Sequence, residues 1–145
     1  MAHFTKLNNN RVVEVITVDD DVMVDLEGQE SETIGIAYLQ RIFGVDTVWK
    51  QTSYNHRMRG NYAGIGYTYM TDVATLGVGS TDIFIQTQPY PSWSIGVNTA
   101  RWYAPIPEPG ITSTQKSNGE FWQWNEAAYQ ADTGNPKTVG WALTS

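Results

Sequence analysis

The sequence predicts an α+β, β-rich protein in which one helix packs on an antiparallel sheet and Trp-containing β-hairpins follow toward the C-terminus. Two observations lead to this class. Short segments rich in Val, Ile, Thr and aromatic residues are separated by Asn, Gly and Pro, a pattern typical of antiparallel strands. A single segment, residues 31–43, combines the apolar spacing and the terminal residues of an amphipathic helix.

The first two strands are expected at residues 3–7 and 11–18. The first of these segments alternates between apolar and polar side chains, and the second is rich in Val and Ile. Residues 8–10, which separate them, are all Asn. Because Asn tolerates the positive φ angles of a tight hairpin turn, we expect the two strands to pair antiparallel.

An acidic segment, residues 19–28, connects this hairpin to the helix and raises the question of a calcium site. An EF-hand loop needs alternating oxygen ligands, Gly at its sixth position and Glu at its twelfth. Counting from Asp19 places Val24 at the sixth position, so the pattern fails although Glu30 is twelfth. The segment is interpreted as a solvated loop. The chain has no Cys, which excludes disulfides, thiolate nucleophiles and Cys-based zinc or iron–sulfur sites. We predict neither a metal site nor a cofactor.

The helix is predicted from its ends and from its apolar stripe. Ser31 is suited to cap the free N–H groups, Glu32 complements the positive end of the helix, and Gly44 suits a left-handed closing residue. The apolar residues that should lie on the sheet are Ile36, Leu39, Ile42 and Phe43.

Strand patterns return after the helix, separated by Gly-rich turns: strands at 47–53, 67–70 and 82–86, and turns at 61–66 and 76–81. We expect these strands to form a meander. Gly64-Ile-Gly66 lacks the spacing of a dinucleotide-binding fingerprint, so it does not indicate phosphate binding. Residues 1–88 are therefore predicted to form one compact α+β unit.

Residues 89–145 form a Pro- and Trp-rich extension that belongs to the same structural domain overall. We expect two Trp-to-Trp hairpins, the first with its tip at 96–99, and a helical turn at 127–131 in the second. Residues 105–110 contain three Pro and form a stiff link between them. A two-stranded hairpin is at best marginally stable alone, so the extension must dock on the N-terminal unit or on a neighbouring chain.

The composition excludes several classes of partner. The net charge of −6 opposes general binding to nucleic acid, which depends on Lys and Arg. The one close basic pair, Arg57 and Arg59, is interpreted as a solvated turn. No apolar run approaches the roughly 20 residues of a membrane-spanning helix, and no signal-peptide core follows Met1. Six Trp and eight Tyr in a chain with few charges instead indicate an aromatic, protein-binding surface.

No catalytic site is predicted. His3 and His56 are the only histidines, and no Gly-x-Ser-x-Gly nucleophile motif is present. Glycosidases need only two suitably spaced carboxylates, and aromatic side chains also stack on sugars. Glu120 and Glu126, which lie near tryptophans, therefore remain the one enzymatic alternative.

Several motifs, taken in order, resemble a group of small, mostly uncharacterised structural-type proteins of tailed phages that infect marine cyanobacteria. They include Met1-Ala-His-Phe4, Trp49-Lys-Gln-Thr-Ser-Tyr-Asn55, Tyr62-Ala-Gly-Ile-Gly-Tyr67, Gln88-Pro-Tyr-Pro-Ser-Trp93 and Trp124-Asn-Glu126. The resemblance covers nearly the whole chain. The sequence departs from the group between Trp124 and Trp141, where the final Trp-strand, turn, Trp-strand is expanded.

The resemblance implies a virion structural protein, synthesised in the host cytoplasm, whose partners are major capsid or tail proteins. A capsid decoration (cement) protein is the favoured role. The alternatives are a tail or neck component that contacts virion proteins or host glycans, and a tail-fibre assembly chaperone; self-association also remains open. The candidate partner-binding residues are Tyr90, Trp93, Trp102, Tyr103, Trp122, Trp124 and Trp141, and the segment from Tyr62 to Tyr69 is the next candidate.

Overall fold

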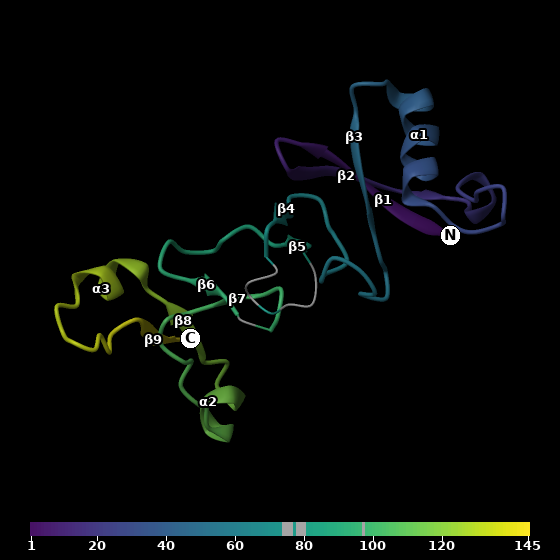
Figure 1. Cartoon of the computed structure of the whole chain (residues 1–145). Coiled ribbons are helices and arrows are strands. Elements are labelled where there is room, and N and C mark those ends of the chain that lie inside the picture. The colour runs from purple at the N-terminus through teal and green to yellow at the C-terminus, as the bar shows by residue number, and fades with distance from the viewer. Residues whose placement is uncertain (74–76, 78–80, 97) are drawn as a thin grey trace. The chain divides into compact units, whose positions relative to one another are not determined.

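The computed structural model describes residues 1–73, 77, 81–96 and 98–145 (Figure 1). These residues fall into two compact units. Unit 1 comprises Met1–Thr87 and Ile95–Arg101, and unit 2 comprises Gln88–Ser94 and Trp102–Ser145. Most of the predicted turn at 76–81 and one residue of the predicted tip at 96–99 lie outside the described residues.

Unit 1 contains a five-stranded antiparallel sheet with the strand order β3-β1-β2-β4-β5. The strands are β1 (Ala2–Asn8), β2 (Arg11–Val18), β3 (Val48–Thr52), β4 (Thr68–Thr71) and β5 (Asp82–Ile85). Asn9 and Asn10 form the turn between β1 and β2 at φ 51° and 64°, as their side chains predict. Together with the helix and the Trp-containing hairpins, this sheet confirms the predicted β-rich α+β class.

The predicted meander is wrong at β3. This strand pairs with β1 at one edge of the sheet, whereas β4 pairs with β2 and β5 forms the other edge. Local turn signals identify strands but do not determine which strands pair. Here the chain returns from the helix beside β1, whose outer backbone groups need hydrogen-bonding partners, and β3 supplies them.

Helix α1 (Glu32–Phe43) lies beside β3 (Figure 1) and begins and ends as predicted. The Ser31 Oγ accepts a hydrogen bond from the Ile34 N–H at 3.4 Å. Gly44, at φ 124°, closes the helix by donating its N–H to the Gln40 carbonyl at 2.9 Å. At this positive φ a residue with a side chain would be strained.

The predicted burial of the helix stripe is only partly correct. Leu39 is buried and Ile36 packs against the same core, but Ile42 and Phe43 are 56% and 43% exposed. Both residues belong to the last turn of α1, and the strand that α1 contacts, β3, lies at an edge of the sheet. Phe43 keeps one aromatic contact, with the Trp49 ring at 5.3 Å between centroids.

Two buried clusters cover opposite faces of the sheet. One lies under α1 and contains Ala2, Phe4, Val18, Met23, Leu39 and Trp49. The other contains Leu7, Val12, Ala63, Tyr69 and Phe84. A register shift between Lys6 and Leu7 pairs Leu7 with Val12 and so places both on the second face. Gly35 lets α1 approach the sheet closely, because an added Cβ would lie 2.5 Å from the Phe4 ring.

Unit 2 is built from short elements, namely β7 (Trp102–Tyr103), α2 (Ser113–Ser117), β8 (Phe121–Trp124), α3 (Glu126–Ala131) and β9 (Trp141–Thr144). Strands β8 and β9 pair antiparallel with Trp124 opposite Trp141. The short strand β6 (Ser94–Ile95), which pairs with β7, spans the point at which the chain leaves unit 2. Helix α3 matches the predicted helical turn, whereas α2 was not predicted.

Candidate partner-binding surface

An aromatic cluster occupies the centre of unit 2. The Trp124 ring contacts Trp141, Trp93 and Tyr129, with centroids 5.3, 6.0 and 5.2 Å away. Trp93 in turn contacts Trp141 at 6.0 Å and Tyr90 at 5.5 Å. Four of the seven residues proposed from sequence are thus brought together: Tyr90, Trp93, Trp124 and Trp141.

The Glu126 carboxylate fixes the central tryptophan. Its Oε1 accepts hydrogen bonds from the Trp124 Nε1 at 2.9 Å and the Ser92 Oγ at 2.5 Å, and its Oε2 accepts one from Gln130 at 2.7 Å. Partial desolvation acts to raise the pKa of Glu126, but the hydrogen bonds from Gln130, Ser92 and Trp124 together lower it below its ordinary value. Glu126 is one of the two carboxylates that the sequence retained for an enzymatic alternative. Both of its oxygens accept hydrogen bonds from residues of unit 2.

The Pro-rich link is anchored to the second hairpin rather than extended away from it. Trp141 donates its Nε1–H to the Ile106 carbonyl at 2.8 Å, and Trp122 donates to the Gly110 carbonyl at 3.1 Å. Two indole N–H groups therefore hold residues 105–110 against the hairpin. The positions of the Trp122 and Trp141 rings are therefore fixed by contacts within the unit.

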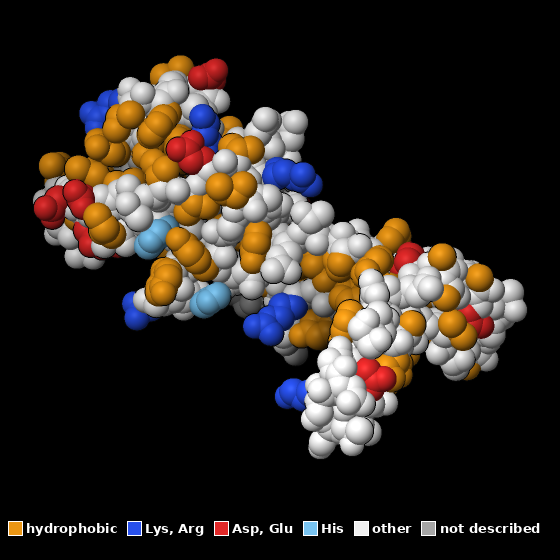
Figure 2. Space-filling view, turned by 180° about the vertical axis from the view of Figure 1, so that it is seen from behind, with side chains coloured by type: hydrophobic (Ala, Val, Ile, Leu, Met, Phe, Trp, Pro, Cys, Tyr) orange, Lys and Arg blue, Asp and Glu red, His pale blue; other side chains and the backbone are white. Residues whose placement is uncertain are grey.

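Most tryptophans of unit 2 remain partly exposed. Trp124 is 5% exposed and forms the centre of the core, but Trp93, Trp102, Trp122 and Trp141 are each only partly buried. Tyr103 and Phe121 are 46% and 50% exposed. Hydrophobic side chains reach the surface of both units on the face that Figure 2 displays.

A pocket of about 280 Å³ opens among these side chains. It is lined by Trp93, Trp102, Tyr103, Ala104, Ile106, Pro107, Glu108 and Trp141, so four of the seven predicted residues share one site. Glu108 is the only charged residue in this lining. The Trp93 Nε1 is buried and has no hydrogen-bond acceptor among the described residues, in contrast to the indole nitrogens of Trp122, Trp124 and Trp141.

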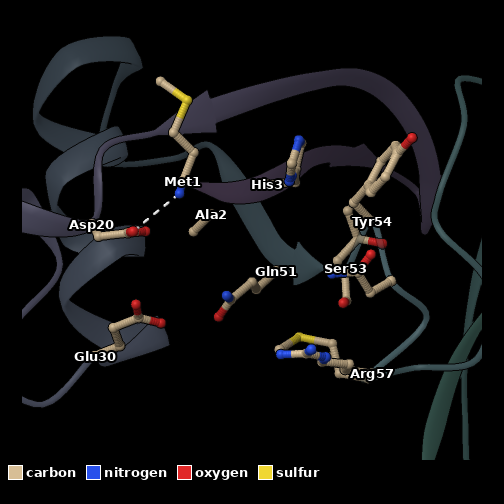
Figure 3. A pocket seen from close by; sticks show the side chains of 12 residues that line it. Met1, Ala2, His3, Asp20, Glu30, Gln51, Ser53, Tyr54 and Arg57 are labelled. Carbon is tan, nitrogen blue, oxygen red and sulfur yellow. Dashed lines mark hydrogen bonds and ion pairs between the residues drawn. The ribbon is translucent and has the colours of Figure 1, made fainter.

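A second pocket, of about 250 Å³, lies in unit 1 and is more polar (Figure 3). Glu30 and Arg57 face each other across its opening, with the Gln51 amide between them. The Met1 amine pairs with Asp20 at 3.0 Å on another side. Because its lining carries charges of both signs, this pocket favours no ligand of a single charge.

The two histidines occupy unrelated positions. His3 lies in an aromatic group with Tyr54 and Tyr62, with ring centroids 6.2 and 5.3 Å from its own. His56 is exposed at φ 58° in the loop that follows β3. In the part of the chain that the structure describes, neither imidazole bonds a carboxylate of the kind that orients a catalytic base.

Arg59 does not belong to a solvated turn, so that interpretation is wrong for this residue. Its side chain is 15% exposed and binds Glu32 and Asp82, each at 2.8 Å, and the Gln51 carbonyl at 2.9 Å. Arg57, by contrast, is exposed. The two carboxylates that bind Arg59 come from α1 and β5, 27 and 23 residues away in the sequence, so no local signal predicted the network.

This network also perturbs two pKa values. Burial acts to lower the pKa of Arg59, but hydrogen bonds and charge interactions with Glu32 and Asp82 raise it. Desolvation, reinforced by donation of its hydroxyl to Asp82 at 2.6 Å, raises the pKa of Tyr69 to about 12. The network thus joins the edge of the sheet to the first turn of α1.

Within the described ranges, no group of three or more His, Cys, Asp or Glu side chains is arranged to hold a metal ion. No helix in that part of the chain is long and apolar enough to cross a membrane. No protein-family model matches the chain, and no curated protein or solved structure is significantly similar to it.

Proposed function

We propose that the protein is a non-enzymatic accessory component of a phage particle, a capsid decoration protein that binds the capsid lattice through unit 2. The observation that carries this proposal is the pocket where Trp93, Trp102, Tyr103 and Trp141 meet while remaining partly exposed. Trp and Tyr are the side chains most enriched at the energetic centres of protein interfaces.

The way this surface is held also supports partner binding. The hydrogen bonds of Trp141 to Ile106 and of Trp122 to Gly110 immobilise the rings and the Pro-rich link. A partner then has less side-chain freedom to remove on binding, which preserves more of the interaction free energy. A protein that attaches to a repeating lattice needs this kind of stable contact and no chemistry.

The assignment to a phage particle rests on the sequence motifs that resemble cyanophage structural proteins. It is tested by purifying particles and measuring the copy number of this protein by quantitative mass spectrometry. Copies stoichiometric with the major capsid protein are expected. A fixed low copy number would assign the protein to the tail or neck instead, and absence from finished particles would favour the assembly chaperone; either result overturns the proposal.

The binding surface is tested with two variants of similar exposure. Tyr103→Ala removes a ring that lines the pocket, and Phe121→Ala removes one from the same unit that does not. We expect Tyr103→Ala alone to lower occupancy on particles, with the melting temperatures of both variants close to that of the wild type. Equal occupancy of the two variants would contradict a role for this pocket in binding.

A further inference from the structure

The aromatic pocket of unit 2 carries a carboxylate, and we infer that it receives a cationic side chain, arginine in particular, from the protein partner. This inference rests on the proposed function, because it specifies the chemistry of the partner. It is carried by the meeting of four aromatic residues with Glu108 in a pocket that contains no basic residue.

The size of the pocket suits one side chain. Its volume of about 280 Å³ lies just below the range of roughly 300–1,000 Å³ that is typical of small-molecule sites. A cofactor or an oligosaccharide would extend well beyond such a space. One long side chain projecting from a partner would fill it.

The lining favours an occupant that is both flat and positively charged. Aromatic faces attract cations, and the attraction strengthens when the cation is removed from water. Glu108 supplies a negative charge at the same place and stands between Pro107 and Pro109, whose rings fix their backbone φ angles. A guanidinium group satisfies both features, because it stacks on aromatic rings and pairs with carboxylates through two parallel hydrogen bonds.

No cation of unit 2 fills this role. The unit contains two basic residues, Lys116 and Lys137, against four acidic ones. Lys137 is already placed over the Tyr129 ring, 4.5 Å from its centroid, and bonds the Tyr129 carbonyl. Lys116 does not line the pocket. Neither lysine of unit 2 supplies the cation, and we infer that it comes from the partner protein, toward which the unit's excess of negative charge is attractive.

A sugar fits the same rings less well. Glycans present many hydroxyl groups, and a site that binds them by hydrogen bonding needs several polar side chains. Here Glu108 and the Tyr103 hydroxyl are the only side-chain oxygens in the lining. A purely apolar partner side chain would in turn leave the Glu108 carboxylate without a counter-charge. The arginine side chain uses both parts of the pocket.

The test uses the full-length protein and the indole N–H signals of its six tryptophans in NMR spectra. The probe is the blocked tripeptide Gly-Arg-Gly, with its neutral citrulline analogue as the comparison. We expect the arginine peptide, in the millimolar range, to shift the signals of Trp93, Trp102 and Trp141 and not that of Trp49, which is buried in unit 1. The citrulline peptide should bind several-fold more weakly.

Two charge-matched variants identify the carboxylate. Glu108→Gln should weaken binding of the arginine peptide several-fold, whereas Glu120→Gln removes the same charge from unit 2 outside the pocket and should leave binding unchanged. Equal effects of the two variants would show that Glu108 acts only through the net charge of the unit. That result would overturn its assignment as the carboxylate that pairs with arginine.

Other outcomes overturn the inference directly. They are equal binding of the arginine and citrulline peptides, no response of the three pocket signals, or a response to methyl cellobioside and not to the peptide. Failure here is distinguishable from failure of the proposed function. If Tyr103→Ala still lowers particle occupancy, the surface binds a partner of different chemistry; if arginine binds but particles lack the protein, only the particle assignment fails.

Discussion

Unit 1 and unit 2 bury their aromatic side chains in different ways. In unit 1, Trp49 is 2% exposed within a cluster that includes Val18, Met23 and Leu39, and its Nε1 donates to the Thr47 hydroxyl at 2.8 Å. In unit 2, the one buried tryptophan, Trp124, is surrounded mainly by other aromatic rings. A sheet covered by a helix supplies enough aliphatic surface to enclose a ring, whereas two short hairpins do not.

The two ways of burying aromatic rings leave different amounts of ring surface exposed. Small units cannot bury a large fraction of their surface, so unit 2 holds its rings by hydrogen bonds as well as by packing. Rings held in this way keep part of their surface available. Unit 1 contains the larger buried clusters, and unit 2 contains the surface on which we propose that partners bind.

The largest expected effect comes from the scaffold. Phe4 is fully buried and packs directly beneath Gly35 of α1. Phe4→Ala should lower the free energy of unfolding by about 3–5 kcal/mol, because it removes apolar contacts and leaves a cavity. Urea denaturation followed by circular dichroism measures this change. Val13→Ala, at a 42% exposed position of β2, is the control and should cost far less.

The next effect probes the core of unit 2. Gly140 is buried against the Trp124 ring, which an added Cβ would overlap. Gly140→Ala should therefore destabilise the unit by about 1–3 kcal/mol, as overpacking does. Gly110→Ala is the matched control, since nothing lies within 4 Å of its added Cβ. Unfolding of both variants is monitored by near-ultraviolet circular dichroism, which reports on packed aromatic rings. Similar unfolding midpoints for the two variants would show that the aromatic cluster is loosely packed.

Local features account for what the sequence predicted correctly. The Asn residues at 8–10 predict the first hairpin, and Ser31 and Gly44 predict the ends of α1, because turns and caps depend on neighbouring residues. Helix α2 was missed although its signal is also local. Thr112 and Gln115 form a reciprocal capping box at its start. The helix itself is polar and lacks the apolar stripe from which α1 was predicted.

Non-local features account for what was missed. The pairing of β3 with β1 and the binding of Arg59 to Glu32 and Asp82 join residues that are far apart in the chain. At the candidate surface, aromatic abundance led to the prediction of seven partner-binding residues, which stays a prediction. Only tertiary packing distinguishes buried Trp124 from Trp93, which lines the pocket.

The stability of the two units should also depend differently on pH. In unit 1 the change is expected at alkaline pH and involves Tyr69. The pKa of Tyr69 is raised to about 12, above the value of 10.0 for a free tyrosine, so folding favours the neutral phenol. Its contribution to stability is complete below pH 10 and is lost as the pH rises toward 12. The unfolding midpoint of the wild type should therefore fall over this interval, and that of Tyr69→Phe should fall less. Parallel curves would contradict a special environment for Tyr69.

The smallest effect is expected for unit 2 in acid. The Asp132 carboxylate accepts hydrogen bonds from the N–H groups of Gly134 and Thr138 at 2.8 Å and of Val139 at 3.0 Å, and these bonds lower its pKa below the ordinary 3.8.

Because the folded-state pKa of Asp132 is the lower one, its contribution is present above pH 3.8 and is lost as the pH falls through the folded-state value. Asp132→Asn should therefore lower the melting temperature slightly at neutral pH and reduce its further decline in acid. Asp21→Asn, at an exposed position, is the control, and its melting temperature should match that of the wild type at neutral and at acidic pH. If Asp132→Asn keeps the full acid dependence of the wild type, the loop after α3 is not held by this carboxylate, and another group must order the chain between Trp124 and Trp141.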